Sequence, residues 1–341
     1  MGNKRLVLAS AAVTLAVSAC TVSPGPREDF PETTATPTTA SGTSNGGVTG
    51  SEAGELTSVG SDSSGGEKLD VNAPDAPVGC EMVDFLFVID NSLSMQTYQE
   101  QLAEEFPNFI AAAFEALPPD VDVHVGITTT DFDYSCGAPE VTGNCQTTAS
   151  FEEVNSHYIT PDVMNNGGNG SQGRLFEWSD QHWFETNSGD DPAALTQWFS
   201  GAAVAAGEQG CSFEMPVAAA GWATDPINAE TNEGFIRDEN ALLVVFFLTD
   251  EPDKSPEPES VHAAQMLAAK EACGGEECIF VSGLIPDCIE GANQKLWQFM
   301  TLFDEGNPPW GDVAQTTQYS QLFGGFLAGA VADACLSIPA A

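Results

Sequence analysis

Two short polar segments directly follow apolar runs in this chain. The segment DNSLS, residues 90–94, comes after the run MVDFLFVI, and TDEPD, residues 249–253, comes after ALLVVFFL. Mg²⁺ and Mn²⁺ prefer oxygen ligands such as carboxylates and hydroxyls. Ca²⁺ prefers the same ligands in a site with a larger coordination sphere. If the two segments meet in space, they predict an all-oxygen site for a divalent cation, with ligands from Asp90, Ser92, Ser94 and Asp250.

The alternating spacing of the first segment suits this chemistry. Side chains two residues apart in an extended chain point the same way, so Asp90, Ser92 and Ser94 can face one ion. Because serine hydroxyls are neutral, a bound ion would keep positive charge with which to attract a carboxylate from outside. The alternative is that DNSLS only caps a helix by accepting backbone N–H bonds, and that TDEPD is only a polar loop.

The hydrophobic pattern predicts the elements that would position these residues. Continuous or alternating apolar runs predict strands at 82–89, 121–127, 241–248 and 278–285. Apolar residues spaced three and four apart predict helices at 96–117, 214–224, 260–273 and 291–303. Alternating strands and helices predict an α/β fold, with a doubly wound, mainly parallel sheet and helices on both faces.

In such a sheet, ligands bind beyond the carboxyl ends of the strands. The two polar segments converge there if their strands are neighbours. We expect further polar residues to line the rim of the site, namely Thr128, Thr130, Asp131 and Glu251. The region of about 134–200 is rich in Gly, Asn and Trp and fits the pattern poorly, so it is predicted to be a loop-rich insertion with some structure of its own.

The DNSLS segment resembles the DxSxS signature of von Willebrand factor type A domains, and FFLTDEPDKS is similar to the strand that carries a later Asp of that family. The resemblance covers residues 80–337. It implies a Rossmann-like fold and a metal-ion-dependent adhesion site that engages an acidic group of a protein or glycan. Several other segments resemble a group of exported bacterial type A lipoproteins: GITTTD, GCSFEMP and NEGFIRDENALLVVFFLTDE.

The chain departs from the family pattern in one place. A Thr normally completes the adhesion site from the loop before a middle helix, but the corresponding AAGEQGCSFEMP contains none. Glu208 or Ser212 is expected to take its place. Glu208 as a ligand would lower the net charge of the ion and favour calcium over Mg²⁺ or Mn²⁺.

The first 78 residues predict export and anchoring. Residues 1–19 have Lys4 and Arg5, an apolar span and then small residues, as in a secretory signal, and they precede Cys20 as in a bacterial lipobox. We therefore expect lipid on Cys20 to be the protein's only contact with the membrane. Residues 20–78 are rich in Thr, Ser, Gly and Pro and predict a disordered tether to a domain at 79–337. Thr21 after the cysteine favours the outer membrane.

The remaining eight cysteines favour disulfides, because the number is even and the chain is predicted to be exported. Two pairs are close enough in sequence for local bridges, Cys136 with Cys145 and Cys273 with Cys278. Topology suggests two long-range pairs, Cys80 with Cys335 at the amino edge of the sheet and Cys211 with Cys288 at the metal edge. No two-residue spacing typical of a zinc knuckle is present.

The charge of the chain excludes one class of partner. Fifty acidic residues against nine basic ones give a formal charge of −41, which repels nucleic acid. The acidic residues are expected to form a solvated surface suited to a salty medium, or else a surface that binds calcium.

The sequence favours a monomeric binding protein over an enzyme. None of the four histidines lies in a nucleophile motif, and GCSFEM lacks the GxSxG pattern of a hydrolase. One alternative is an envelope protein in which calcium only stabilises the fold. Another is a metal-dependent hydrolase with Glu251 or Asp131 as its base.

Overall fold

The computed structural model describes residues 79–133, 145–162, 167–291, 293–304, 308–315, 319, 322 and 327–338. All of them belong to the compact unit Leu69–Ala341. The expected signal peptide, Cys20, the tether and Cys136 lie outside the described residues. Within these ranges, no helix combines the length and the apolar character needed to cross a bilayer.

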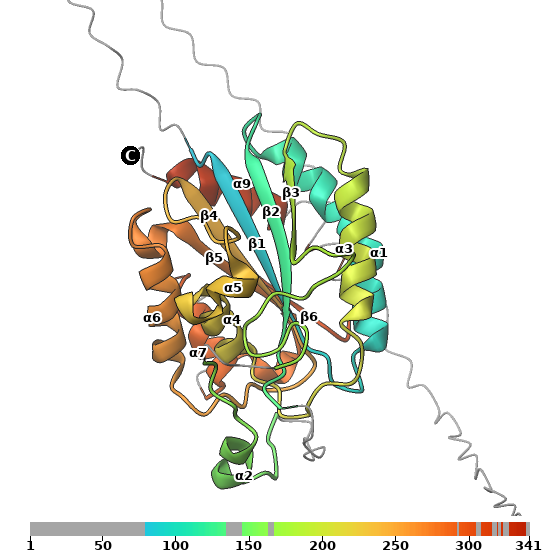
Figure 1. Cartoon of the computed structure of the whole chain (residues 1–341), viewed down its shortest axis with the longest axis vertical. Coiled ribbons are helices and arrows are strands. Elements are labelled where there is room, and N and C mark those ends of the chain that lie inside the picture. The colour runs from blue at the N-terminus through green and yellow to red at the C-terminus, as the bar shows by residue number, and fades with distance from the viewer. Residues whose placement is uncertain are drawn as a thin grey trace, which may run out of the picture. The chain divides into compact units, whose positions relative to one another are not determined.

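A six-stranded sheet in the order β3-β2-β1-β4-β5-β6 forms the centre of the domain (Figure 1). Neighbouring strands are parallel except for β3, which runs antiparallel to β2. This arrangement confirms the predicted mainly parallel α/β fold. The strands are β1 (Met82–Ile89), β2 (Asp122–Thr129), β3 (Trp183–Asn187), β4 (Ala241–Leu248), β5 (Ile279–Ile285) and β6 (Trp310–Asp312).

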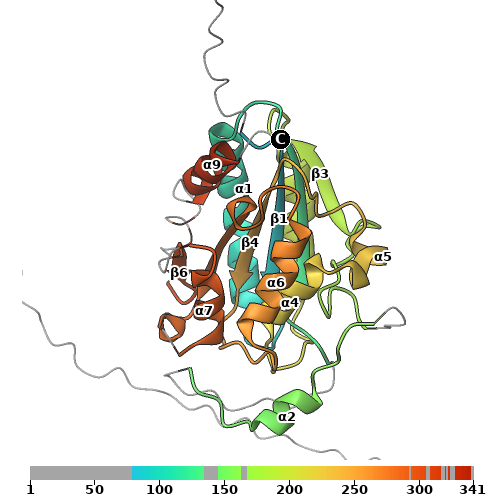
Figure 2. The ribbon, with the colours of Figure 1, turned by 90° about the vertical axis from the view of Figure 1, so that its left-hand side faces the viewer.

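Helices cover both faces of the sheet (Figures 1 and 2). On one face lie α1 (Gln96–Ala116), α3 (Ala193–Ala205) and α9 (Leu327–Ser337), and on the other lie α4 (Pro216–Thr224), α6 (Glu259–Ala269) and α7 (Lys295–Thr301). The short helices are α2 (Phe151–Ser156), η1 (Pro226–Asn228), α5 (Ala229–Asn232), η2 (Gly275–Cys278) and η3 (Asp287–Ile289).

The central strands are largely apolar because helices bury them from both sides. In β1, Phe85 and Phe87 pack into the α1 side, whereas Leu86 and Val88 pack into the α4 side. Phe87 also contacts Phe199 of α3 edge to face, with ring centroids 4.6 Å apart. The strand that ends at the candidate site is therefore held rigidly.

The region predicted to be an insertion contributes to the sheet and to its cover. β3 pairs with β2 from Asp122↔Asn187 to Gly126↔Trp183, and α3 buries its apolar side against α1. The sequence predicted an insertion with some structure of its own but did not indicate that its second half joins the sheet. The sequence WFETN is short and half-buried, so it lacks the continuous apolar run that identifies the other strands.

Two expected disulfides are present at the amino edge and beside β5. Cys80 is bonded to Cys335, which joins the start of β1 to α9, and Cys273 is bonded to Cys278. A bridge between residues 255 positions apart strongly restricts the unfolded chain. Structural disulfides of this kind indicate an extracytoplasmic protein.

Candidate metal centre

The strand register brings the two polar segments together. Ile89 at the end of β1 lies between Thr129 of β2 and Leu248 of β4, so Asp90 emerges where all three strands end. The Asp90 N–H donates to the Leu248 carbonyl at 2.8 Å, which continues the ladder by one residue. Asp250 follows Leu248 by two residues, so both carboxylates lie at the same edge of the sheet.

The Asp90 carboxylate is completely buried and fixed through both oxygens. Its Oδ1 accepts the Ser92 backbone N–H at 2.8 Å, and its Oδ2 accepts the Thr249 hydroxyl at 2.7 Å. The hydroxyl oxygens of Ser92 and Ser94 are 3.3 Å apart, as the alternating spacing predicts. Gln99 of α1 donates to the Asp90 carbonyl at 2.9 Å and holds the turn against the helix.

Asp90 and Asp250 repel each other electrostatically. Burial, and then the negative charge of Asp250, raise the pKa of Asp90 to about 6, although hydrogen bonds from Ser92 and Thr249 oppose the shift. Burial also raises the pKa of Asp250, which accepts a hydrogen bond from Ser94. Two carboxylates held this close favour a bound proton or a cation between them.

Glu214 is an acidic residue of this cluster that the sequence did not reveal. It lies two residues before α4 and is completely buried. The Thr130 hydroxyl donates to its Oε2. Burial, and then the charge of Asp90, raise its pKa well above the ordinary value.

The acidic cluster around Asp90 thus includes Glu214. The sequence had instead suggested Glu208 for this position. Glu208 is half-buried in the loop after α3, and among the described residues no hydrogen bond joins its carboxylate to the Asp90 cluster. Ser212, the other expected substitute for Thr, is half-buried, and its carbonyl accepts a bond from Lys254 at 3.2 Å. The segment GCSFEM gives no sign that Glu214 is buried. Only the fold shows that its side chain points into the protein.

Several buried oxygens at this edge lack a hydrogen-bond donor within the described part of the chain. They include Asp250 Oδ1 and Glu214 Oε1. An unpaired buried carboxylate oxygen is costly, and a hard divalent cation satisfies such oxygens together. The residues that fit this cation are Asp90, Ser92, Ser94, Asp250 and Glu214.

The four residues expected at the rim have different environments. Thr128 is buried and its hydroxyl donates to the Gly170 carbonyl at 3.0 Å, so it does not line a rim. Thr130 is also buried, against Glu214. Glu251 is half-buried and forms an ion pair with Lys254.

Asp131, the fourth of these residues, is completely buried. Its Oδ1 accepts the Cys211 N–H at 3.2 Å, and its Oδ2 has no hydrogen-bond donor among the described residues. Burial raises its pKa to about 6.

One disulfide near the site differs from the expected pairing. Cys145 is bonded to Cys288, which ties the segment that leads into α2 to η3 after β5. The predicted bridge from Cys211 to Cys288 and the local bridge from Cys136 to Cys145 are therefore wrong. Cys211 is disulfide-bonded as well. Sequence spacing did not reveal this pairing because the loops that carry the cysteines have no regular pattern.

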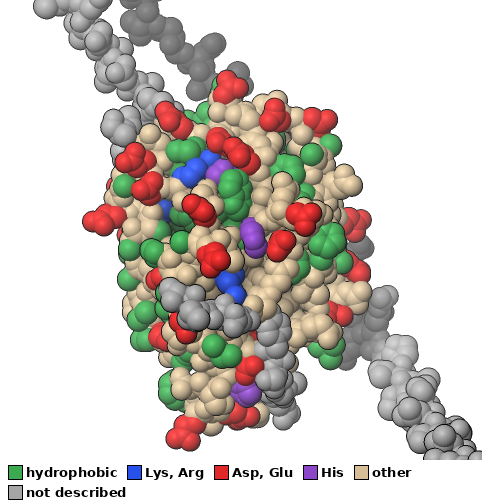
Figure 3. Space-filling model, in the orientation of Figure 1, with side chains coloured by type: hydrophobic (Ala, Val, Ile, Leu, Met, Phe, Trp, Pro, Cys, Tyr) green, Lys and Arg blue, Asp and Glu red, His purple; other side chains and the backbone are tan. Residues whose placement is uncertain are grey.

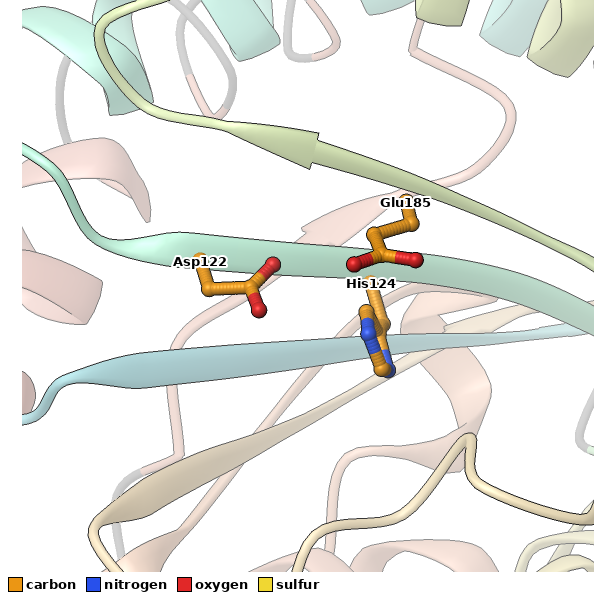
Figure 4. A group of neighbouring side chains, drawn as sticks. All are labelled: Asp122, His124 and Glu185. Carbon is orange, nitrogen blue, oxygen red and sulfur yellow. The ribbon is translucent and has the colours of Figure 1, made fainter.

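A separate group, Asp122, His124 and Glu185, has ligand atoms that all lie within 4.8 Å of one another (Figure 4). Two carboxylates and an imidazole at these distances could hold a metal ion. It lies near the start of β2, where Met82 pairs with Asp122, eight residues before Asp90; at about 3.3 Å per residue this is roughly 26 Å. Arg237 Nη1 lies 3.1 Å from Asp122 Oδ2. Asp122 and His124 thus already have partners, since His124 Nδ1 also contacts the Phe235 carbonyl at 3.0 Å. Asp250 Oδ1 and Glu214 Oε1 have none among the described residues, so the Asp90 cluster is the stronger candidate.

Comparison with solved structures gives distant matches. One is a von Willebrand factor type A protein from Catenulispora acidiphila, with 12% identity and a TM-score of 0.36, over 74% of this chain and 43% of that chain. Another is proximal thread matrix protein 1 from the mussel byssus, with 12% identity and a TM-score of 0.38, over 74% and 48%. This chain spans less than half the length of either.

No protein-family model matches the chain, and a search of curated proteins finds no match. The fold assignment rests on the sheet order and the two helical layers described above. The domain is an α/β domain with a mainly parallel six-stranded sheet between two layers of helices.

Proposed function

We propose that this protein is an extracytoplasmic binding protein whose activity depends on one divalent cation held by Asp90, Ser92, Ser94, Asp250 and Glu214. The observation that carries the proposal is the pair of buried carboxylate oxygens, Asp250 Oδ1 and Glu214 Oε1, that lack donors among the described residues. The Asp90 carboxylate beside them is fully buried. A cation supplies the positive charge that this group lacks.

The proposed partner is a protein or glycan that presents a carboxylate. Ser94 is exposed and Asp250 is half-buried, so the site is reachable from the solvent at the carboxyl edge of the sheet. A bound cation would attract such a carboxylate. The protein's own residues hold the ion and leave that side open.

A second candidate function is a calcium site that only stabilises the fold, and Glu214 is the observation that favours it. A third carboxylate beside Asp90 and Asp250 lowers the net charge of the ion and suits calcium better than magnesium. Such an ion attracts an external carboxylate less strongly. The two functions differ in whether the ion keeps an exchangeable position.

We propose binding without catalysis, because each histidine ring already has a partner. The Nδ1 atoms of His124 and His182 contact the carbonyls of Phe235 and Leu175 at 3.0 and 3.3 Å. Those of His157 and His262 contact side chains at 2.9 and 2.8 Å, namely Asp133 and Gln265. Of the two acids that a metal-dependent hydrolase would use as its base, Glu251 forms an ion pair with Lys254 and Asp131 is completely buried.

Anchoring belongs to the same proposal. Lipid on Cys20 and a tether over 20–78 would place the domain at the surface of a bacterial envelope, in the manner of the exported lipoproteins that the sequence resembles. Metabolic labelling with a fatty acid tests this. Label that is lost in Cys20→Ser supports the anchor, and label that remains removes it.

The test of the binding function uses Mn²⁺ as the probe ion, because it relaxes the protons of water that exchanges on and off the metal. We expect the purified protein to enhance water-proton relaxation when it binds Mn²⁺, and an aspartate-containing peptide to reduce that enhancement. Saturable Mn²⁺ binding without enhancement would favour the stabilising site. Absence of saturable binding would remove both functions.

A further inference from the structure

Lys254 lies in the loop after β4 with its side chain turned into the protein. The side chain is 2% exposed, which is exceptional for lysine because burial of an unpaired ammonium is costly. Its backbone N–H donates to the Glu214 carbonyl at 2.8 Å. The loop that carries Asp250 and the segment that carries Glu214 are therefore joined at this residue.

The ammonium group of Lys254 faces the acidic cluster. It forms an ion pair with Glu251 and donates to the Ser212 carbonyl at 3.2 Å. Its charge also acts on Glu214 and Asp250. One buried cation thus interacts with three carboxylates, two of which are proposed ligands of the divalent ion.

The other lysine near this edge has a different role. Lys295 donates to the backbone carbonyls of Ser255 and Glu257, and its charge acts on Asp253. It fastens α7 to the loop after β4. Lys295 therefore provides a matched control, because it is a hydrogen-bonded lysine at the same edge of the sheet that is not paired with the acidic cluster.

We propose that Lys254 is a built-in counter-ion of the metal site, which holds the acidic cluster together without a divalent ion and sets a lower affinity for one. This inference rests on the metal-binding part of the proposed function. Like charges buried together destabilise the fold unless a cation compensates them. The same ammonium repels an incoming Ca²⁺, so the site exchanges its ion instead of retaining it permanently.

The experiment compares the full chain with Lys254→Met, which keeps a similar length and removes the charge. Calorimetric titration with Ca²⁺ should show affinity tighter by at least about tenfold, because the repulsion between two cations is lost. Thermal unfolding in EDTA should show a lower midpoint than wild type. Lys295→Met should leave the Ca²⁺ affinity unchanged.

A second pair of variants separates this proposal from the proposed function. Lys254→Met should lower the midpoint in EDTA much less in a Glu214→Gln background, because one repelling carboxylate is already neutral. This cycle needs no metal, so it tests the counter-ion even if wild type binds no Ca²⁺. If Lys254→Met alone does not fold, recovery of folding in the Glu214→Gln background supports the counter-ion, and failure to fold in both backgrounds contradicts it.

Three outcomes would overturn the inference. They are an unchanged or weaker Ca²⁺ affinity in Lys254→Met, an unchanged midpoint in EDTA, or an equal loss of midpoint in both backgrounds. Tighter binding together with a smaller loss in the Glu214→Gln background supports it. Failure of wild type to bind any divalent ion would instead remove the proposed function.

Discussion

At the scale of single residues, the acids of the site are held where water cannot solvate them. Asp90, Asp131 and Glu214 are all completely buried, and burial is the largest cause of the raised pKa of each. A buried carboxyl with a raised pKa retains its proton in the folded state at pH values where the unfolded chain has lost it.

This sets the pH dependence of the metal-free protein. Between pH 4 and about 6 the folded state binds more protons than the unfolded state, so the free energy of unfolding falls as pH rises. Urea unfolding in EDTA should give lower stability at pH 7 than at pH 4.5. The share of Asp131 alone is up to about 3 kcal/mol, and Asp131→Asn should remove that share of the slope.

Divalent ions should weaken this pH dependence of stability, because they bind the ionised carboxylates. With saturating Ca²⁺, the loss of stability between pH 4.5 and 7 should be smaller than in EDTA. Stability in EDTA that rises over this interval would contradict the assignment of these acids as buried groups with raised pKa values.

At the scale of elements, covalent bridges close the sheet at both ends. The Cys80–Cys335 bridge joins the start of β1 to α9, and the Cys145–Cys288 bridge joins loops at the carboxyl edge. The Cys80 N–H also donates to the Cys335 carbonyl at 2.8 Å. The strand that ends at Asp90 is thus fixed at its beginning as well as along its length.

The Cys80–Cys335 bridge closes a long loop and the Cys273–Cys278 bridge a short one, so they should contribute differently to stability. Replacing Cys80 and Cys335 by Ala frees a loop of 255 residues, whereas the Cys273 and Cys278 pair spans only 5. The loss should be on the order of 2–5 kcal/mol for the long loop and smaller for the short one. Urea unfolding of the two double variants measures this difference, and an equal or reversed order would argue against the closing role.

The sequence predicted the position of some strands accurately and missed others. β1 and β4 were predicted to the residue because both are buried apolar runs bounded by polar residues. β3 was missed because an edge strand needs only one covered face, and WFETN is half-buried. Glu214 was missed for a similar reason, since the direction of its side chain depends on the packing of α4.

At the scale of the whole molecule, the charged side chains exposed on the described part of the surface are acidic. Figure 3 shows acidic side chains spread over the face in view. The basic residues of the described part are buried or half-buried, and all have internal partners: Arg174, Arg237, Lys254, Lys270 and Lys295. The cations therefore stabilise the interior and leave the surface charge uncompensated.

Salt should stabilise such a protein. Screening shortens the range of repulsion from about 10 Å at 0.1 M to about 3 Å at 1 M, while buried ion pairs are affected much less. We expect the thermal midpoint to rise between 0.05 and 1 M KCl by several degrees. Sucrose at matched osmolality is the control for exclusion effects, and a midpoint that falls with KCl would show that ion pairs outweigh surface repulsion.

The general location of the site could be predicted from sequence, whereas its full composition could not. Asp90 and Asp250 each follow a strong strand, and parallel neighbours bring such positions together. The counter-ion Lys254 and the acid Glu214 come from irregular segments. Nothing in their spacing indicates that either side chain is buried.

The central claim is that Asp90 and Asp250 share one divalent cation at the carboxyl edge of the sheet. The most direct test is calorimetric titration of the purified protein with Ca²⁺, Mg²⁺ and Mn²⁺, beside Asp90→Ala, Asp250→Ala and the control Asp122→Asn from the opposite edge. We predict saturable binding of one ion, lost in both alanine variants and kept in the control. Equal binding by all four proteins would contradict the claim.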